Sequence, residues 1–311
     1  TIDDIAVWDS SDDAGADLFF TATDGSPDTL SLPANYKLLV WDNKSFAPGG
    51  NVTVSGGGAG AVYDGTVELN DGATWTSVGT EVHNIGGSFL SGTGATFDAG
   101  NSTTTFTTSG ASRSIDINDG SFYNVAFTGS GSWTVSDTVL DVENFTQTAG
   151  ALTLPTGTTT VSGYFNATGG SFTNSGSLMI FDGTGTDNVV RFDDSAVAEV
   201  RFTGTGSWAM TDINATTTND VTVASGTVSL PSGSLTVEGS FRNTGGSVTH
   251  NTSELILATT TTGTLLASSS NLYGVTFRGG TYTMGDSSLT LLDTLSIESG
   301  SVTLATGTLT I

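Results

Sequence analysis

The chain has 311 residues, and charged side chains make up only 12% of it, roughly half the usual share. Its 31 acidic residues outnumber seven Lys and Arg, which gives a formal net charge of −24. This charge argues against nucleic acid and anionic membranes as partners. The chain has no cysteine, which excludes disulfides and thiolate metal sites, and no apolar run long enough to predict a membrane span.

Residues 1–64 fit the pattern of the rest poorly and predict a less regular N-terminal β segment, either a cap or opening coils. The apolar stretches 17–21 and 37–41 predict strands that could take part in assembly. Between Asp9 and Asp17, four carboxylates lie close together in the chain. Because calcium takes six to eight oxygen ligands, this cluster predicts a calcium site as the alternative to a solvated acidic loop. Its members are Asp9, Asp12, Asp13 and Asp17.

Residues 65–311 repeat with a period of roughly 75 residues, the kind of internal repetition that marks a repeat architecture. The segment VAFTGSGSW at 125–133 returns as VRFTGTGSW at 200–208, and VTFRGGTY at 275–282 is a third copy with one residue deleted. A second segment recurs in step, as AGALTL, SGTVSL and SGSVTL. These copies divide the region into 65–148, 149–224, 225–298 and a partial copy at 299–311.

Within each copy, short stretches of alternating polarity are separated by clusters of Gly, Asn, Asp and Ser, which predicts strands joined by turns. Leu255 and Leu257 should face inward with Glu254 outward, and Met179 and Phe181 should be their inward counterparts. A β-propeller would need longer blades closed by tight hairpins, and few Asn-Gly or Asp-Gly turns are present. The fold class predicted is therefore all-β, a parallel β-helix (β-solenoid) with about 19 residues per coil and about four coils per copy.

The repeat resembles one found in bacterial cell-surface β-helix proteins of the adhesin or surface-filament type. The residues that carry the resemblance are Phe122, Tyr123, Asn124, Phe127, Gly129, Trp133, Leu154, Val161, Gly163 and Phe165, with later matches at Val237, Gly239, Phe241, Asn243, Leu272, Tyr273 and Gly274. The resemblance implies stacked parallel coils on a cell surface with an adhesive or structural role. It carries no catalytic residues.

Few residues suggest chemistry. No nucleophile elbow, phosphate loop or zinc-protease motif is present. His83 and His250 are far apart in sequence, and His250 is expected at a turn or on the surface. Asp193 and Asp194, near Arg191 and Arg201, are the best candidates for a carboxylate pair of a polysaccharide-cleaving enzyme, and the alternative is that they are turn residues.

Two further sets of residues recur with the repeat. Trp133, Trp208 and Tyr282 occupy one repeat position and are expected in the core, with an outward platform for sugars as the alternative. The Gly-x-Gly pairs at 129–131 and 204–206 are expected at turns that need a positive φ.

Shape and contact, more than a reactive pocket, are therefore expected to carry the function. The first hypothesis is a structural subunit of an extracellular surface assembly (a filament, sheath or surface layer) on a prokaryotic cell, with copies of itself as partners and no enzyme activity. The alternative is a cell-surface adhesin or glycan-binding module, and a polysaccharide-cleaving enzyme ranks third.

Overall fold

A computed structural model describes residues 18–19, 29–34, 36–56, 65–174, 176–304 and 307–311. The chain divides into two compact units. Unit 1 comprises residues 1–155 and 168–172, and unit 2 comprises residues 156–167 and 173–311. This division rests on compactness, and the sequence-based division at residue 64 stays a prediction.

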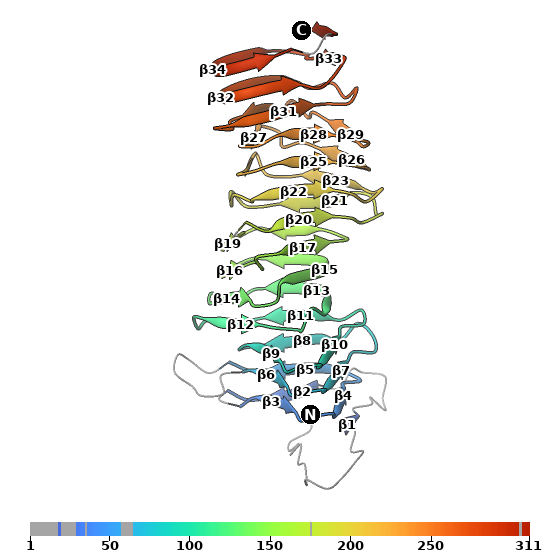
Figure 1. The fold of residues 1–311 in the computed structure, drawn as a ribbon. Coiled ribbons are helices and arrows are strands. Elements are labelled where there is room, and N and C mark those ends of the chain that lie inside the picture. Colours follow the sequence, from blue (N-terminus) through green and yellow to red (C-terminus); the bar gives the residue numbers. More distant parts are fainter. Residues whose placement is uncertain (1–17, 20–28, 35, 57–64, 175, 305–306) are drawn as a thin grey trace. The chain divides into compact units, whose positions relative to one another are not determined.

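Each unit is a β-solenoid in which strands of successive coils stack in parallel (Figure 1). The strands lie on three sides of each unit, and some of them span two sides. In unit 1, side 1 contains β1 (Leu18–Phe19), β4 (Ser45–Ala47), β7 (Thr74–Thr76), β10 (Thr96–Asp98) and the first parts of β13 (Ser121–Phe127) and β15 (Val139–Gln147). Side 2 contains β2 (Thr29–Leu32), β5 (Asn51–Val54), β8 (Val82–Ile85), β11 (Thr103–Phe106) and the later parts of β13 and β15. Side 3 contains β3 (Leu38–Val40), β6 (Val67–Leu69), β9 (Phe89–Ser91), β12 (Arg113–Ile115), β14 (Ser132–Val135) and β16 (Ala151–Thr153).

Unit 2 repeats this plan. Side A contains β17 (Thr158–Val161), β20 (Leu178–Phe181), β22 (Glu199–Phe202), β25 (Val221–Val223), β28 (Phe241–Asn243), β31 (Thr262–Leu266) and the later parts of β32 (Gly274–Met284) and β34 (Leu295–Thr303). Side B contains β18 (Phe165–Ala167), β21 (Asn188–Arg191), β23 (Ser207–Met210), β26 (Thr227–Ser229) and β29 (Ser247–Thr249). Side C contains β24 (Asn214–Thr217), β27 (Ser234–Val237), β30 (Glu254–Leu257) and the first parts of β32 and β34, while β33 (Ser288–Thr290) and β35 (Thr308–Thr310) form a further parallel pair. β19 (Ser171–Thr173) contains residues of both units.

The prediction of a parallel β-solenoid is confirmed, and the coil length is consistent with the expected one. Ser234, Glu254 and Gly274 pair in successive coils, which places them at equal intervals along the chain. The predicted inward residues Leu255, Leu257, Met179 and Phe181 are fully buried, whereas Glu254 is only partly buried. Inward side chains thus stack on the equivalent side chain of the next coil and form the core.

The sequence repeat and the coil are out of phase. Phe202 and Phe277 are equivalent in the repeat, yet Phe202 stacks with Val223 on side A, whereas Phe277 stacks with Leu257 on side C. One copy therefore spans three full coils and two further sides instead of four coils. Equivalent residues of successive copies in unit 2 consequently face in different directions, so a repeated outward residue cannot form a row along one side.

The prediction that the Gly-x-Gly pairs are needed for a positive φ was wrong. Gly129, Gly131, Gly204 and Gly206 do not adopt a positive φ. A Cβ atom on Gly204 would lie 2.1 Å from the carbonyl oxygen of Gly183 in the preceding coil, and one on Gly129 would lie 2.0 Å from that of Thr108. These glycines are needed because two turns of backbone pass closer than any side chain allows.

We expect the stacked core to dominate stability. Leu235 is fully buried between Ala215 and Leu255 of the adjacent coils, so Leu235→Ala should lower the free energy of unfolding by about 2–5 kcal/mol. Thr236→Ala, on the outward face of the same strand, should change it by less than about 1 kcal/mol. Urea unfolding followed by circular dichroism measures both, and equal effects would contradict the inward–outward assignment.

Candidate functional site

The predicted calcium cluster, Asp9, Asp12, Asp13 and Asp17, lies outside the described residues. In the described ranges, no group of three or more His, Asp or Glu side chains is arranged to hold a metal ion. The same ranges contain no helix with the length and apolar composition of a membrane span.

The aromatic residues of the repeat lie in the core. Trp133, Trp208 and Tyr282 are each at most 2% exposed, which confirms the core expectation and removes the outward sugar platform. Each packs against the phenylalanine of its own copy, with ring centroids 5.2, 5.6 and 5.1 Å apart. The Tyr282 hydroxyl accepts a hydrogen bond from the Thr259 backbone N–H at 2.7 Å and donates to the Gly239 carbonyl at 3.2 Å.

The carboxylate pair Asp193 and Asp194 is a turn. Both residues have a positive φ, 50° and 63°, in the left-handed region that Asp tolerates better than most residues. Asp193 accepts a hydrogen bond from Arg191 at 3.0 Å, whereas Arg201 binds Glu199 at 3.2 Å. The structure therefore uses this pair to shape a corner, as the alternative interpretation predicted.

A buried carboxylate in the next coil fastens this turn. Asp212, 7% exposed, accepts hydrogen bonds from the backbone N–H groups of Phe192 at 2.8 Å and Asp193 at 2.9 Å. Peptide N–H donors at a bend need such an acceptor when water cannot reach them.

The same arrangement, a carboxylate that accepts two backbone N–H groups of a turn in the preceding coil, occurs in each of the three longer copies of the repeat, and we call it the clamp. Asp137 accepts the N–H groups of Ile117 and Asp119 at 2.9 and 3.1 Å, and Asp286 accepts those of Ala267 and Ser268 at 2.7 Å each. Each clamped turn holds two consecutive residues other than glycine at positive φ. Positions 137, 212 and 286 follow one another at the interval of the repeat, so the repeat itself offered a signal that sequence reasoning missed.

Burial raises the pKa of Asp212 and Asp137, and the hydrogen bonds from the clamped backbone partly oppose that rise. A raised carboxyl pKa in a cleft would suggest a general acid. Here both oxygens of each carboxylate accept hydrogen bonds from backbone donors, so the residues serve the turn.

The two histidines play different structural roles. His83 is fully buried, and its Nε2 lies 2.9 Å from the Ser77 hydroxyl, which also accepts the Trp75 indole N–H at 3.1 Å. Burial lowers the pKa of His83 to about 4, and the nearby Glu81 only partly offsets this effect. His250 lies at a turn, as expected, where its Nδ1 accepts the Thr252 N–H at 3.0 Å and its ring stacks on Tyr273.

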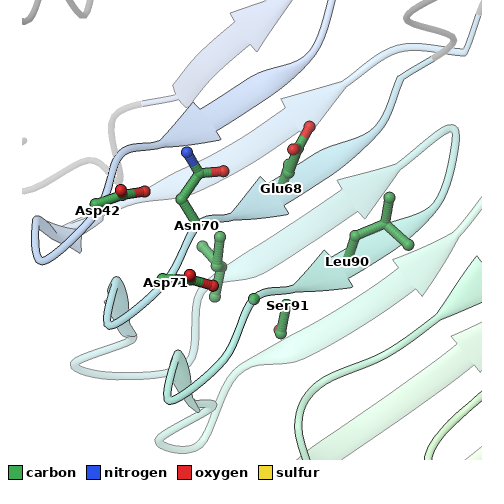
Figure 2. Close-up of a pocket in the computed structure, with 8 residues that line it drawn as sticks. Asp42, Glu68, Asn70, Asp71, Leu90 and Ser91 are labelled. Atoms are coloured by element: carbon green, nitrogen blue, oxygen red, sulfur yellow. The ribbon is translucent and has the colours of Figure 1, made fainter.

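An open polar groove lies on the outer surface of side 3 in unit 1, across the ends of β6 and β9 (Figure 2). Glu68 in this groove accepts a hydrogen bond from Lys37 at 2.6 Å, and Asp71 accepts one from the Thr93 backbone N–H at 2.7 Å. The sequence did not single out any of the residues that line the groove, which are Asp42, Glu68, Leu69, Asn70, Asp71, Leu90, Ser91 and Gly92. Its acceptor groups suit hydroxyl-rich or cationic ligands more than anions.

The few cations are committed to contacts within the chain. Lys37, Arg191, Arg201, Arg242 and Arg278 form ion pairs with carboxylates, and Lys44 and Arg113 also have interaction partners. Every Lys and Arg of the chain therefore already has a partner within it.

No protein-family model matches the chain, and comparison with curated proteins and with solved structures finds no match either. The residues and their geometry are thus the basis for any proposal about function.

The clamp should contribute measurably to stability. We expect Asp212→Ala to leave two backbone N–H groups without their acceptor and to lower the free energy of unfolding by about 1–3 kcal/mol. Glu238→Ala removes the same charge from an exposed position on a neighbouring coil and should change it by less than about 0.5 kcal/mol. Urea titrations of both variants provide the measurement, and equal unfolding midpoints would count against a structural clamp.

His83 should make the fold acid-sensitive. Its pKa is lower in the folded chain, about 4, than the unfolded value of 6.5, so protonation favours the unfolded state. Its contribution is fully present above pH 6.5 and is lost as the pH falls toward 4. Between pH 7 and pH 4, the stability advantage of the wild type over His83→Gln should shrink by about 3 kcal/mol. A stability difference between the two proteins that does not change with pH would refute a buried, neutral His83 imidazole.

Proposed function

We propose that the chain is a structural subunit of an extracellular surface assembly on a prokaryotic cell, a filament, sheath or surface layer, built by stacking or strand exchange of solenoid subunits. The observation that carries the proposal is that, among the described residues, the side chains best suited to chemistry are already used by the fold. The repeat aromatics fill the core, the candidate carboxylates form a turn, and the clamp carboxylates bind backbone N–H groups.

Stacking provides the mode of assembly. Successive coils are joined by parallel ladders of backbone hydrogen bonds, and a coil of another copy offers the same donors and acceptors. Ile297 on β34 stacks on Phe277 of the preceding coil, as an inward residue does, yet 53% of its surface is exposed. Packing of a second copy against this coil would bury it.

Glycan binding is the second candidate. The groove on side 3 favours it, because carboxylate, amide and hydroxyl groups line an open surface there, and Trp41, next to Asp42, is 45% exposed. Polysaccharide cleavage has less support, because Asp193 and Asp194 are engaged in a turn.

Electron microscopy of the purified chain, with and without calcium, should show filaments or sheets. Ile297→Lys places a charge on the stacking surface and should abolish them, because an inward-pointing charge blocks strand pairing. Ile213→Lys is the matched control, since Ile213 is 71% exposed on an interior coil and its replacement should leave assembly intact. Monomers under all conditions, or equal loss in both variants, would refute assembly through this coil.

A further inference from the structure

Side 2 of unit 1 presents an uncharged, regular outer surface. Its six strands, β2, β5, β8, β11 and the later parts of β13 and β15, contain no Asp, Glu, Lys or Arg, and their single histidine, His83, points into the core. Each strand directs two residues outward. We call these twelve residues the uncharged face: Thr29, Ser31, Asn51, Thr53, Val82, Asn84, Thr103, Thr105, Asn124, Ala126, Asn144 and Thr146.

The uncharged face is unusual in a chain with a net charge of −24. The neighbouring side 1 carries Asp98 and Asp141 in its strands, and side 3 carries Glu68 and Arg113. A continuous neutral surface over six coils therefore separates two charged sides, and it suits a partner that carries no charge.

The outward residues form two files, that is, two rows of side chains that run from coil to coil along the solenoid. Pairing is in register throughout, so that Thr103 lies beside Asn124 and Asn124 beside Asn144, while Thr105 lies beside Asn84 in the preceding coil. Figure 1 shows these strands stacked one above another within unit 1. All the outward residues except Ser31 and Val82 are half-buried, which indicates that they lie close to the surface without protruding.

Hydrogen bonds between coils hold these side chains in place. Asn124 donates to the Thr103 hydroxyl at 3.2 Å, and Asn144 donates to the Asn124 amide oxygen at 2.8 Å. In the other file, Asn84 donates to the Thr53 hydroxyl at 3.3 Å. Groups fixed in this way lose little further conformational freedom on binding an ordered surface.

The spacing of the files matches the spacing of ordered water. Neighbouring strands lie about 4.8 Å apart, so hydroxyl and amide groups recur at that interval along each file, except where Val82 interrupts one file and Ala126 the other. In a tetrahedral water network with O···O distances of about 2.75 Å, two oxygens bonded to the same third oxygen lie about 4.5 Å apart. The difference of about 0.3 Å per coil is small enough for several adjacent groups to engage one row of such a lattice.

We propose that the uncharged face of unit 1 binds the surface of an ice crystal. Its threonine hydroxyls and asparagine amides bind lattice water, while the threonine methyls, Val82 and Ala126 cover the surface between them. Ice binding is a further function beside the proposed assembly. It uses side 2 of unit 1, whereas the proposed assembly uses the coil of unit 2 that contains β34.

Two other neutral partners fit the face less well. A second copy would meet an area of about 300 Å² here, from strand spacing and rise, whereas a stable protein interface needs about 800 Å² per partner. A neutral polysaccharide is usually held by exposed aromatic rings together with polar groups. No outward residue of this face is aromatic.

Thr105→Tyr tests the proposal, with Thr134→Tyr as the matched control. Thr105 lies in the middle of the uncharged face on β11, and Thr134 is exposed on β14 of side 3 in the same unit. Tyrosine suits a strand, so both variants should fold, which circular dichroism and thermal unfolding verify. The readouts are adsorption of fluorescently labelled protein to a growing ice hemisphere and inhibition of ice recrystallisation.

We expect the wild type and Thr134→Tyr to adsorb to ice and slow recrystallisation, and Thr105→Tyr to fall to the level of a non-binding protein. Absence of adsorption by the folded wild type, or equal adsorption by the two variants, would overturn the proposal. Sedimentation with insoluble cellulose is a parallel measurement, and binding there without ice adsorption would also overturn it in favour of a neutral glycan. None of these outcomes depends on whether the chain forms filaments.

Discussion

The parallel backbone ladder between successive coils is the constraint on which the remaining structure depends. It fixes the distance between coils, and thereby decides which side chains the corners can hold. A Cβ atom on Gly183 would lie 1.7 Å from the carbonyl oxygen of Ser162, so no other residue fits at that corner without moving the backbone. At three corners the chain bends through pairs of left-handed residues instead, and there a carboxylate such as Asp212 accepts the freed N–H groups. Corners and clamps are therefore consequences of the stacking.

The inward half of the fold could be predicted from the sequence because burial alone determines it. Leu255 and Leu257 alternate with outward residues in a strand, and a side-chain period of two leaves one choice of face. The phase of the repeat could not be predicted in the same way, because it depends on corner lengths. The coil that separates Phe241 from its partner Leu265 is longer than the one that separates Ser234 from Glu254, and a corner has no periodic signal that would reveal the difference.

The candidate sites illustrate the same limit. Asp193 and Asp194 suggested chemistry because adjacent carboxylates near arginines occur in active sites, and only the backbone conformation showed that they form a turn. Asp137, Asp212 and Asp286 were visible as a repeated aspartate, but their role depends on which coil lies next to them. The groove around Glu68 and Asp71 combines residues from turns and strands of different coils, and nothing in the local sequence joins them.

The reactive side chains described above make contacts within the fold. A binding partner would therefore be recognised mainly through the regular spacing of outward side chains from coil to coil. Because the repeat is out of phase with the coil, equivalent outward residues in unit 2 are distributed over different sides, and the repeat cannot build a single binding row there. Uniform sides arise instead where unrelated segments place similar residues in register, as Thr29, Asn51, Thr103 and Asn144 do on side 2 of unit 1. That side is neutral although the chain is strongly acidic, and the repeat does not enforce this composition. Its pattern therefore calls for a cause outside the coil geometry, and a regular, uncharged binding partner supplies one.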